Sequence, residues 1–224
     1  MLLDGGARVL VTGRSEAGVE SAQKEIGTDA IVVSSDARSL TEIDALASRV
    51  KAEFDTFDLL FVNAGFSCRA SLENMTEAIY DEMFNLNAKG PYFAVQKLAP
   101  SMNRGGAVVL TTSVANVKGM PGIAPYGAAK AALRSFARML AVELLPPEIR
   151  VNAVTPGPID TPILDKMFPE KDVAAEVTRK MSDINPMKRW GTSEEVAKAV
   201  LFLAFDATFT TGAELPVDGG WSQL

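Results

Sequence analysis

The stretch Phe57-Asp-Leu-Leu-Phe-Val62, followed by Asn63-Ala-Gly65, decides the fold class. Its apolar run is short and ends in small and polar residues, as expected of a buried strand rather than a helix. Four other short apolar runs have the same character: 8–12, 30–34, 107–112 and 149–154. Longer stretches with helical spacing separate these runs. The alternation predicts an α/β fold in which crossover helices join parallel strands.

The remaining elements follow from the same patterns. Helices are expected at 15–26, 40–54, 76–102 with a break at Gly90-Pro91, 124–144 and 193–205, and a last strand at 214–217. The proline-containing segment 159–190 is expected to be irregular, with a short helix near 173–181, and to form a substrate lid. The chain shows no repeat, low-complexity tract or linker. We therefore predict a single domain over 1–224.

Composition excludes several classes of partner. Lys and Arg total 22 against 28 Asp and Glu, and no basic block stands out, which argues against nucleic acid and anionic membranes as partners. No apolar run approaches the roughly 20 residues that span a bilayer, and the first residues lack the pattern of a signal peptide. Cys68 is the one cysteine, so no internal disulfide can form. A cytoplasmic protein is expected.

The chain contains no histidine. This excludes Ser-His-Asp and Cys-His catalysis and every histidine-ligated metal site, and we expect no metal. Proton transfer near neutral pH must then depend on a Tyr, Lys, Asp or Glu with a shifted pKa.

Tyr126-Gly-Ala-Ala-Lys130 offers such a pair. Residues four apart lie one turn apart on the same helix face, so the ammonium can lower the phenol pKa from its usual value of about 10. The phenol could then exchange a proton with a carbonyl or an alcohol. Ser113 ends the strand at 107–112, where ligands bind in open α/β sheets. The alternative is a surface tyrosine beside a solvated lysine.

These residues, together with others in the same order, resemble the short-chain dehydrogenase/reductase family, which includes β-ketoacyl-carrier-protein reductases and many carbonyl reductases. The resemblance covers essentially the whole chain and implies a Rossmann-type, doubly wound parallel sheet. The matching motifs are Asp36, Asn63-Ala-Gly65, Asn87, Ser113, Tyr126-x-x-x-Lys130, Pro156-Gly157 with Thr161, and Asp218-Gly-Gly220.

The amino terminus departs from the family pattern. Family members begin with a strand and the loop Thr-Gly-x-x-x-Gly-x-Gly, which holds the cofactor pyrophosphate. Thr12–Gly18 resembles that loop, but its second glycine is one position late, and Glu20 stands where the third is expected. Residues 5–14 align better with the family's second strand. The first strand, which would lie between 8–12 and 57–62, and the glycine loop are then missing.

Two explanations for this departure are open. The chain starts at a downstream methionine of a longer protein, which we favour, or it is a natural variant that closes the gap by dimer exchange or rearrangement. In either case the two strands beside the gap carry unpaired backbone groups. We expect the chain to bind NADPH poorly and to be less stable than an extended form.

The resemblance also implies catalytic roles. Tyr126 would be the general acid/base, and Lys130 would lower its pKa and bind the nicotinamide ribose. Ser113 would hydrogen-bond the substrate oxygen. Asn87 would hold a water that links Lys130 to solvent, or would simply kink the helix beside Gly90-Pro91.

Cofactor contacts follow in the same way. Arg14, after the neutral Gly13, would bind a 2′-phosphate and favour NADP(H) over NAD(H), unless it is an ordinary surface arginine. Asp36 would bind the adenine amino group, unless it is a turn residue. The other implied cofactor-binding residues are Asn63, Ala64, Gly65, Tyr126, Lys130, Pro156, Gly157, Ile159 and Thr161.

The sequence thus predicts an NADP(H)-dependent oxidoreductase that interconverts a small ketone or aldehyde and an alcohol. One alternative is a non-enzymatic, oligomeric member of the same fold that lacks its cofactor site, and a third is an isomerase or dehydratase that uses the same Tyr and Lys. The helices at 76–102 and 124–144 form the family's pairing surface, so a homotetramer, or failing that a homodimer, is expected.

Overall fold

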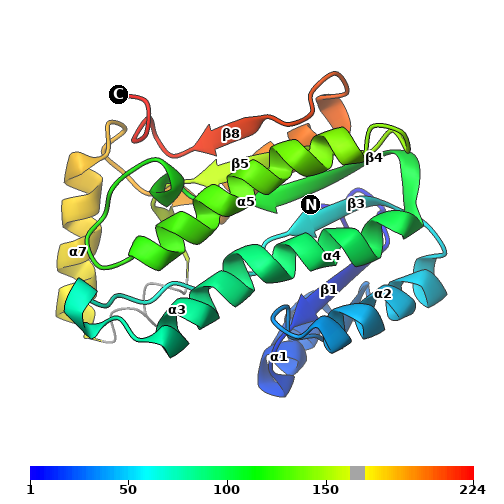
Figure 1. The fold of residues 1–224 in the computed structure, drawn as a ribbon, viewed down its shortest axis with the longest axis horizontal. Coiled ribbons are helices and arrows are strands. Elements are labelled where there is room, and N and C mark those ends of the chain that lie inside the picture. The colour runs from blue at the N-terminus through cyan, green and yellow to red at the C-terminus, as the bar shows by residue number, and fades with distance from the viewer. Residues whose placement is uncertain (162–169) are drawn as a thin grey trace.

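A four-stranded parallel sheet forms the centre of the computed structural model, which describes residues 1–161 and 170–224. Its strand order is β3-β4-β5-β8, and every neighbouring pair is parallel. The strands are β3 (Phe57–Val62), β4 (Met102–Thr111), β5 (Arg150–Pro156) and β8 (Glu214–Val217). This arrangement confirms the predicted α/β class. The arrowheads of β4, β5 and β8 in Figure 1 show that their carboxyl ends share one edge.

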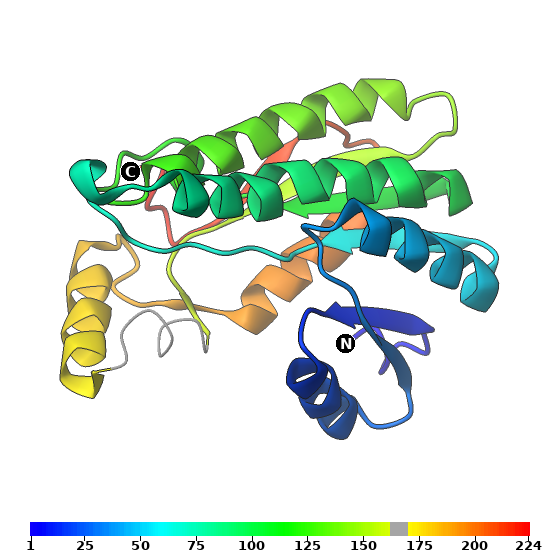
Figure 2. The same cartoon turned by 60° about the horizontal axis from the view of Figure 1, so that its bottom comes forward.

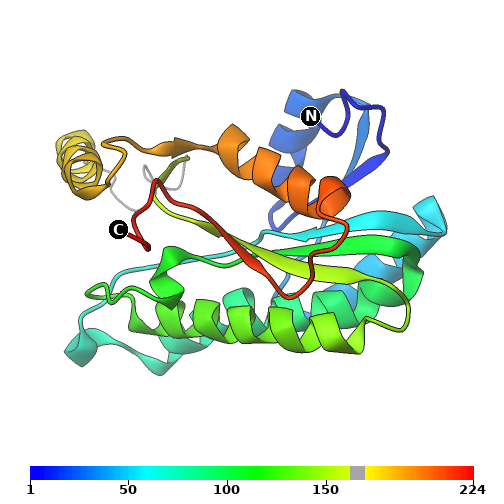
Figure 3. The same cartoon turned by 90° about the horizontal axis from the view of Figure 1, so that it is seen from above.

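Helices cover both faces of this sheet (Figures 1 and 3). One face packs against α4 (Gly90–Leu98) and α5 (Ala124–Glu143), and the other against α8 (Ser193–Leu201). In β4, Val108 and Leu110 belong to the first apolar cluster, while Ala107 and Val109 belong to the second. Successive side chains of a strand point to opposite faces. Because both faces are buried, β4 appears in the sequence as one continuous apolar run.

The starts and ends of the helices have local causes. α8 begins with a capping box, in which the Thr192 hydroxyl accepts a hydrogen bond from the Glu195 amide and the Glu195 carboxylate accepts one from the Thr192 amide. This confirms the helix start expected there. α5 begins with Pro125 in its first turn, where a missing N–H costs nothing. Within the described residues, no helix has both the length and the apolar character needed to span a membrane.

A second, smaller sheet stands apart from the first. It consists of β1 (Val9–Gly13) and β2 (Ala30–Ser34), joined by α1 (Glu16–Ile26) and followed by α2 (Leu40–Phe54). Among the described residues, no hydrogen-bonded ladder joins β1 to β3, and Figure 2 shows the β1–β2 pair set off from β3. The sheet is therefore interrupted at the position where the sequence placed a missing strand.

The predicted helix at 76–102 has an irregular centre. It consists of α3 (Glu77–Phe84), a π-helical turn (Asn85–Lys89) and α4, and it ends in a 3₁₀ turn (Ala99–Ser101). The expected break is thus a π-helical turn just before Gly90, and the helix continues beyond it as α4 (Figure 1). Gly90 lies against the backbone of Ala37, and a Cβ at position 90 would come within 2.0 Å of the Ala37 carbonyl oxygen.

Gly90→Ala is expected to destabilise the fold by about 2 kcal/mol. Overpacking against rigid backbone costs 1–3 kcal/mol or more, which exceeds the roughly 1 kcal/mol that alanine gains over glycine in a helix. Urea unfolding followed by circular dichroism measures the difference. Gly119→Ala is the matched control, because nothing lies within 4 Å of a Cβ at position 119. Equal stabilities of the two variants would contradict the packing argument.

The predicted lid segment is only partly irregular. Two short strands, β6 (Ile159–Asp160) and β7 (Gly191–Thr192), pair in parallel, and α7 (Lys171–Ile184) includes the short helix expected near 173–181 and extends beyond it. Residues 162–169 of the predicted lid lie outside the described residues. The lid role stays a prediction.

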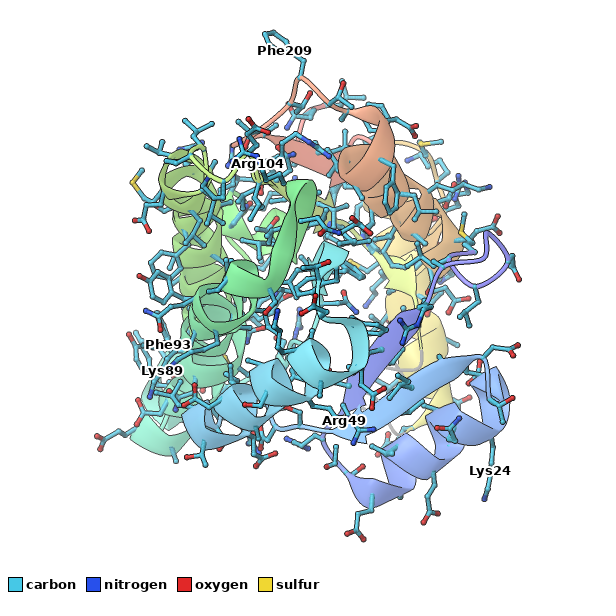
Figure 4. The ribbon with its side chains drawn as sticks, turned by 90° about the vertical axis from the view of Figure 1, so that its right-hand side faces the viewer. Lys24, Arg49, Lys89, Phe93, Arg104 and Phe209 are labelled. Atoms are coloured by element: carbon cyan, nitrogen blue, oxygen red, sulfur yellow. The ribbon has the colours of Figure 1, made fainter. Side chains whose placement is uncertain are left out.

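Several long side chains point outward from the surface of the molecule (Figure 4). Figure 4 shows Phe209 projecting from the loop before β8, and its side chain is fully exposed. Lys24 of α1 and Arg49 of α2 also point to solvent in this view.

Candidate active site

Ser113 and Tyr126 meet at the carboxyl end of β4. Ser113 follows β4 and precedes a 3₁₀ turn (Val114–Asn116), where its Oγ accepts a hydrogen bond of 3.2 Å from the Ala115 amide. Tyr126 lies in the first turn of α5, and Ser113 lies close enough to its hydroxyl to lower the pKa of that hydroxyl. The strand end and the helix start therefore bring together the two hydroxyls that the sequence predicted to act together.

Lys130 lies one turn further along α5 and is 2% exposed. Its Nζ donates a hydrogen bond of 2.7 Å to the Thr111 carbonyl oxygen and lies 5.8 Å from the centroid of the Tyr126 ring. Burial lowers the pKa of Lys130 from 10.5 to about 8, because a buried ammonium loses its hydration. Lys130 therefore changes charge close to neutral pH.

The pKa of Tyr126 differs from the expectation. Burial raises the pKa of the Tyr126 hydroxyl, and the hydrogen bond from Ser113 only partly opposes that effect. The predicted lowering by Lys130 is therefore wrong for the protein in this state. The physical reason lies in the geometry: the Lys130 ammonium lies over the ring and donates to the Thr111 carbonyl, while the low-polarity surroundings disfavour a phenolate.

Asn87 is completely buried in the π-helical turn. Its Nδ2 donates to the carbonyl oxygens of Phe66, at 2.7 Å, and Met83, at 2.8 Å, and its Oδ1 accepts a 3.2 Å bond from the Phe66 amide. A Cβ at Gly65 would lie 3.0 Å from Asn87 Oδ1 and 3.5 Å from Lys130 Nζ. From its place in the π-helical turn, Asn87 thus holds the segment after β3 close to Lys130. Its role in holding a water stays a prediction.

A cavity of about 770 Å³ opens where β3, β4 and β5 end. It is lined by ten of the residues predicted to act: Asn63, Ala64, Gly65, Ser113, Tyr126, Lys130, Pro156, Gly157, Ile159 and Thr161. Asn87 does not line the cavity itself, but it contacts two residues that do, Gly65 and Phe66. Residues far apart in the sequence are gathered here because parallel strands end at one edge of the sheet.

Several cavity residues were missed by sequence reasoning. Among them are Phe66, Met120, Trp190 and Trp221. Trp221 directly follows Asp218-Gly-Gly220, a turn in which the Asp218 carboxylate accepts hydrogen bonds from the Gly220 and Ser222 amides. The position of Phe66 and Trp221 next to two recognised motifs was a usable signal. Trp190 was included only as the last residue of the predicted lid at 159–190, and Met120 is isolated in the sequence and gave no signal.

Arg14 and Asp36 lie outside this cavity, at the ends of β1 and β2. Arg38 binds the Asp36 carboxylate through Nε, at 2.9 and 3.0 Å, and its Nη1 lies 3.0 Å from Glu82 Oε1. This pairing lowers the pKa of Asp36. Arg14 is exposed, with its Nη1 3.9 Å from the same Glu82 oxygen. Arg38 was missed, although its place two residues after Asp36 was a local signal.

Comparison with known proteins gives the class. A family model described as enoyl-(acyl carrier protein) reductase matches residues 1–222. A 3-oxoacyl-acyl-carrier-protein reductase of Thermotoga maritima is 37% identical over 80% of this chain and 72% of its own length. An oxidoreductase of Sarocladium schorii is 34% identical over 99% of this chain and 88% of its own. A solved structure described as a putative β-ketoacyl-ACP reductase has a TM-score of 0.86 and 36% identity, covering 100% of this chain and 90% of that one.

The parallel sheet with its site at the strand ends defines a Rossmann-like oxidoreductase. The chain belongs to the short-chain dehydrogenase/reductase family. Membership implies a nicotinamide cofactor and a small-molecule substrate. The cavity fits the nicotinamide end of such a cofactor, since Gly65 leaves free the space that a Cβ would fill beside Asn87 and Lys130. Arg14, Asp36 and Arg38 lie outside this cavity, near the ends of β1 and β2, and among the described residues no strand lies between β1 and β3.

Proposed function

We propose that this chain is an NADP(H)-dependent oxidoreductase that interconverts a ketone or aldehyde and an alcohol. The observation that supports it most is the joint placement of Ser113, Tyr126 and Lys130 in one cavity at the carboxyl ends of the strands. When bound, the cofactor supplies or accepts the hydride. The protein supplies orientation and the proton.

Each side chain has a role that its surroundings suit. The Tyr126 hydroxyl gives a proton to the carbonyl oxygen during reduction, and Ser113 Oγ hydrogen-bonds the same oxygen as charge develops on it. The raised pKa of Tyr126 keeps its hydroxyl protonated and able to donate. Lys130, with a pKa of about 8, binds the ribose and passes protons onward through a water held near Asn87.

The cavity favours an apolar substrate. Met120, Trp190 and Trp221 line it together with Phe66. Relatives described as 3-oxoacyl-acyl-carrier-protein reductases make a β-ketoacyl thioester the first substrate to test. NADP(H) is preferred over NAD(H) in this proposal because Arg14 is exposed at the end of β1, and its ion-pair partner, Glu82, lies 3.9 Å away, so its guanidinium can turn to a 2′-phosphate.

The interrupted sheet favours a second candidate function. Because β1 and β3 are not paired with each other, the chain could be an oligomeric member of the family that has lost cofactor binding and catalysis. The exposed apolar side chains of Met139, Val142 and Leu145 at the end of α5 offer such a protein a contact surface with further copies of itself.

An NADPH titration separates the two functions. The chain is compared with a form extended at its amino terminus by a strand and the loop Thr-Gly-x-x-x-Gly-x-Gly, using nicotinamide fluorescence. We expect only the extended form to bind, because the loop amides hold the pyrophosphate, and we expect it to oxidise NADPH when a ketone is added.

The control is the extended form with its last loop glycine changed to glutamate. Tight binding by the unextended chain would mean that the chain holds the pyrophosphate without the loop Thr-Gly-x-x-x-Gly-x-Gly. Failure of the extended form to bind would favour the non-enzymatic function.

A further inference from the structure

We propose that Glu214 is a positioning residue, which holds the Ser113 turn against the helix that carries Tyr126. This inference rests on the proposed function, because it concerns the hydroxyl pair of the same site. Glu214 begins β8, is absent from the cavity wall, and its side chain is 17% exposed. It therefore acts, in this proposal, only through other residues.

One carboxylate oxygen of Glu214 binds both sides of Ser113. Glu214 Oε1 lies 2.8 Å from Thr112 Oγ1 and accepts a 2.7 Å hydrogen bond from Asn116 Nδ2. Thr112 directly precedes Ser113, and Asn116 ends the 3₁₀ turn that follows it. The same oxygen accepts a 2.6 Å bond from Thr155 Oγ1 of β5. Glu214 Oε1 thus contacts the chain on both sides of Ser113, in addition to the bonds that the amide and hydroxyl of Thr112 make with the Val154 carbonyl oxygen of β5.

The other oxygen binds α5. Glu214 Oε2 accepts a 3.0 Å bond from Arg134 Nε, and Arg134 Nη1 donates to the Gly212 carbonyl at 3.0 Å. Arg134 lies about two turns beyond Tyr126 on the same helix. The Glu214 carboxylate therefore joins the element that carries Ser113 to the element that carries Tyr126.

Asn116 shows how strongly the turn depends on this carboxylate. Its Oδ1 is buried and has no hydrogen-bond partner among the described residues, so its amide is fixed through Nδ2 alone. Its backbone N–H donates to the Ser113 carbonyl oxygen at 2.9 Å. Removing the carboxylate leaves Asn116 Nδ2 and Arg134 Nε, two partly buried donors, without their acceptor, although Arg134 Nη1 keeps its bond to Gly212. Unpaired donors of this kind are costly, and the turn can relieve the cost by shifting.

The test follows the pKa of Tyr126, which depends on its bond to Ser113 and needs no cofactor. The chain is labelled with 3-fluorotyrosine, whose lower pKa brings the titration into a range where the protein stays folded, and ¹⁹F NMR is recorded against pH. The sequence has three tyrosines, and Tyr126→Phe assigns the signal.

Because the Ser113 bond lowers the pKa of Tyr126, Ser113→Ala is expected to raise it. Glu214→Ala is expected to raise it in the same direction, Glu214→Gln to a smaller extent, and the Ser113→Ala/Glu214→Ala double variant no further than Ser113→Ala alone. A Glu214→Ala pKa equal to that of the wild type, while Ser113→Ala raises it, would overturn the proposal. If Glu214→Ala does not fold, Asn116→Ala makes the same test.

Glu195→Ala is the matched control. It also removes a carboxylate that binds an arginine and an amide, Arg189 and the amide of Thr192, and it has no contact with the Ser113 turn. It should lower stability without changing the pKa of Tyr126. A variant that only loses stability would therefore not show the raised pKa of Tyr126 that is expected for Glu214→Ala.

Activity supplies a second arm, in a form that reduces a ketone with NADPH. Glu214→Ala is expected to lower kcat by about 100-fold, as a misplacement near 1 Å can, with the KM for NADPH unchanged. An unchanged kcat would overturn the proposal. If Tyr126→Phe also kept full turnover, the proposed function would fall, while the ¹⁹F titration would still decide whether Glu214 positions Ser113.

Discussion

Tyr126→Phe is expected to lower kcat for ketone reduction by about 10²- to 10⁴-fold, the range that a positioned proton donor contributes. The substitution removes the hydroxyl that meets Ser113 and keeps the ring that lies beside Lys130. Stopped-flow or steady-state oxidation of NADPH gives the rate, in whichever form of the chain binds the cofactor. The Kd for NADPH and the free energy of unfolding should stay close to those of the wild type, so the loss would be one of chemistry.

Tyr92→Phe is the matched control for this loss. Tyr92 lies on α4, where its ring contacts Phe93 and Phe136, and it does not line the cavity. It should keep wild-type turnover. If Tyr126→Phe also stayed within threefold of the wild type, Tyr126 would not be the general acid/base.

Lys130→Met is expected to remove a rise in stability that the wild type shows between pH 8 and 10.5. The folded-state pKa is about 8 against an ordinary value of 10.5. Between these values the unfolded chain binds more protons than the folded one, so the free energy of unfolding increases with pH. The full rise amounts to about 3 kcal/mol. Below pH 8 the buried charge destabilises the fold by that amount.

Urea unfolding at pH 7, 8, 9 and 10 measures this effect as the difference between variant and wild type. Lys97→Met serves as the control for the loss of a lysine, since Lys97 is a partly exposed lysine paired with Asp44. Parallel curves for Lys130→Met would show that Lys130 keeps its ordinary pKa. Lys130→Met should have no activity at any pH. Lys130 would then be a residue that catalysis requires even though its buried charge lowers the stability of the fold.

The strands and helices, and the approach of Ser113 to Tyr126, could be predicted because each depends on short-range patterns. Alternation of apolar runs gives the parallel sheet, and spacing along α5 gives the Tyr126 and Lys130 pair. β4 begins earlier than expected, at Met102, because the β3–β4 register shifts: Phe57 pairs with Met102 and Leu59 with Ala107. Such a register shift depends on the partner strand, so the apolar residues of β4 alone do not indicate it.

The features that were missed depend on long-range contacts. Asn87 bonds the backbone of Phe66, on a different segment, and Glu214 meets Thr112 from the far end of the chain. No local spacing encodes these contacts. The pKa of Tyr126 was predicted in the wrong direction for a related reason: residue spacing indicates which charge is near, whereas burial depends on the whole fold.

The interrupted sheet has a consequence for how the molecule comes apart. The two apolar cores draw their residues from Phe57 onward, α1 has no buried residue, and the dense contacts of β1, α1 and β2 are with one another. Segments with so few buried contacts open by local unfolding at lower free energy than the rest. Arg14 belongs to this unit, and Asp36 follows its last strand. A ligand that needs them binds only while the unit is folded, so its apparent affinity falls with the fraction of molecules in which the unit is open.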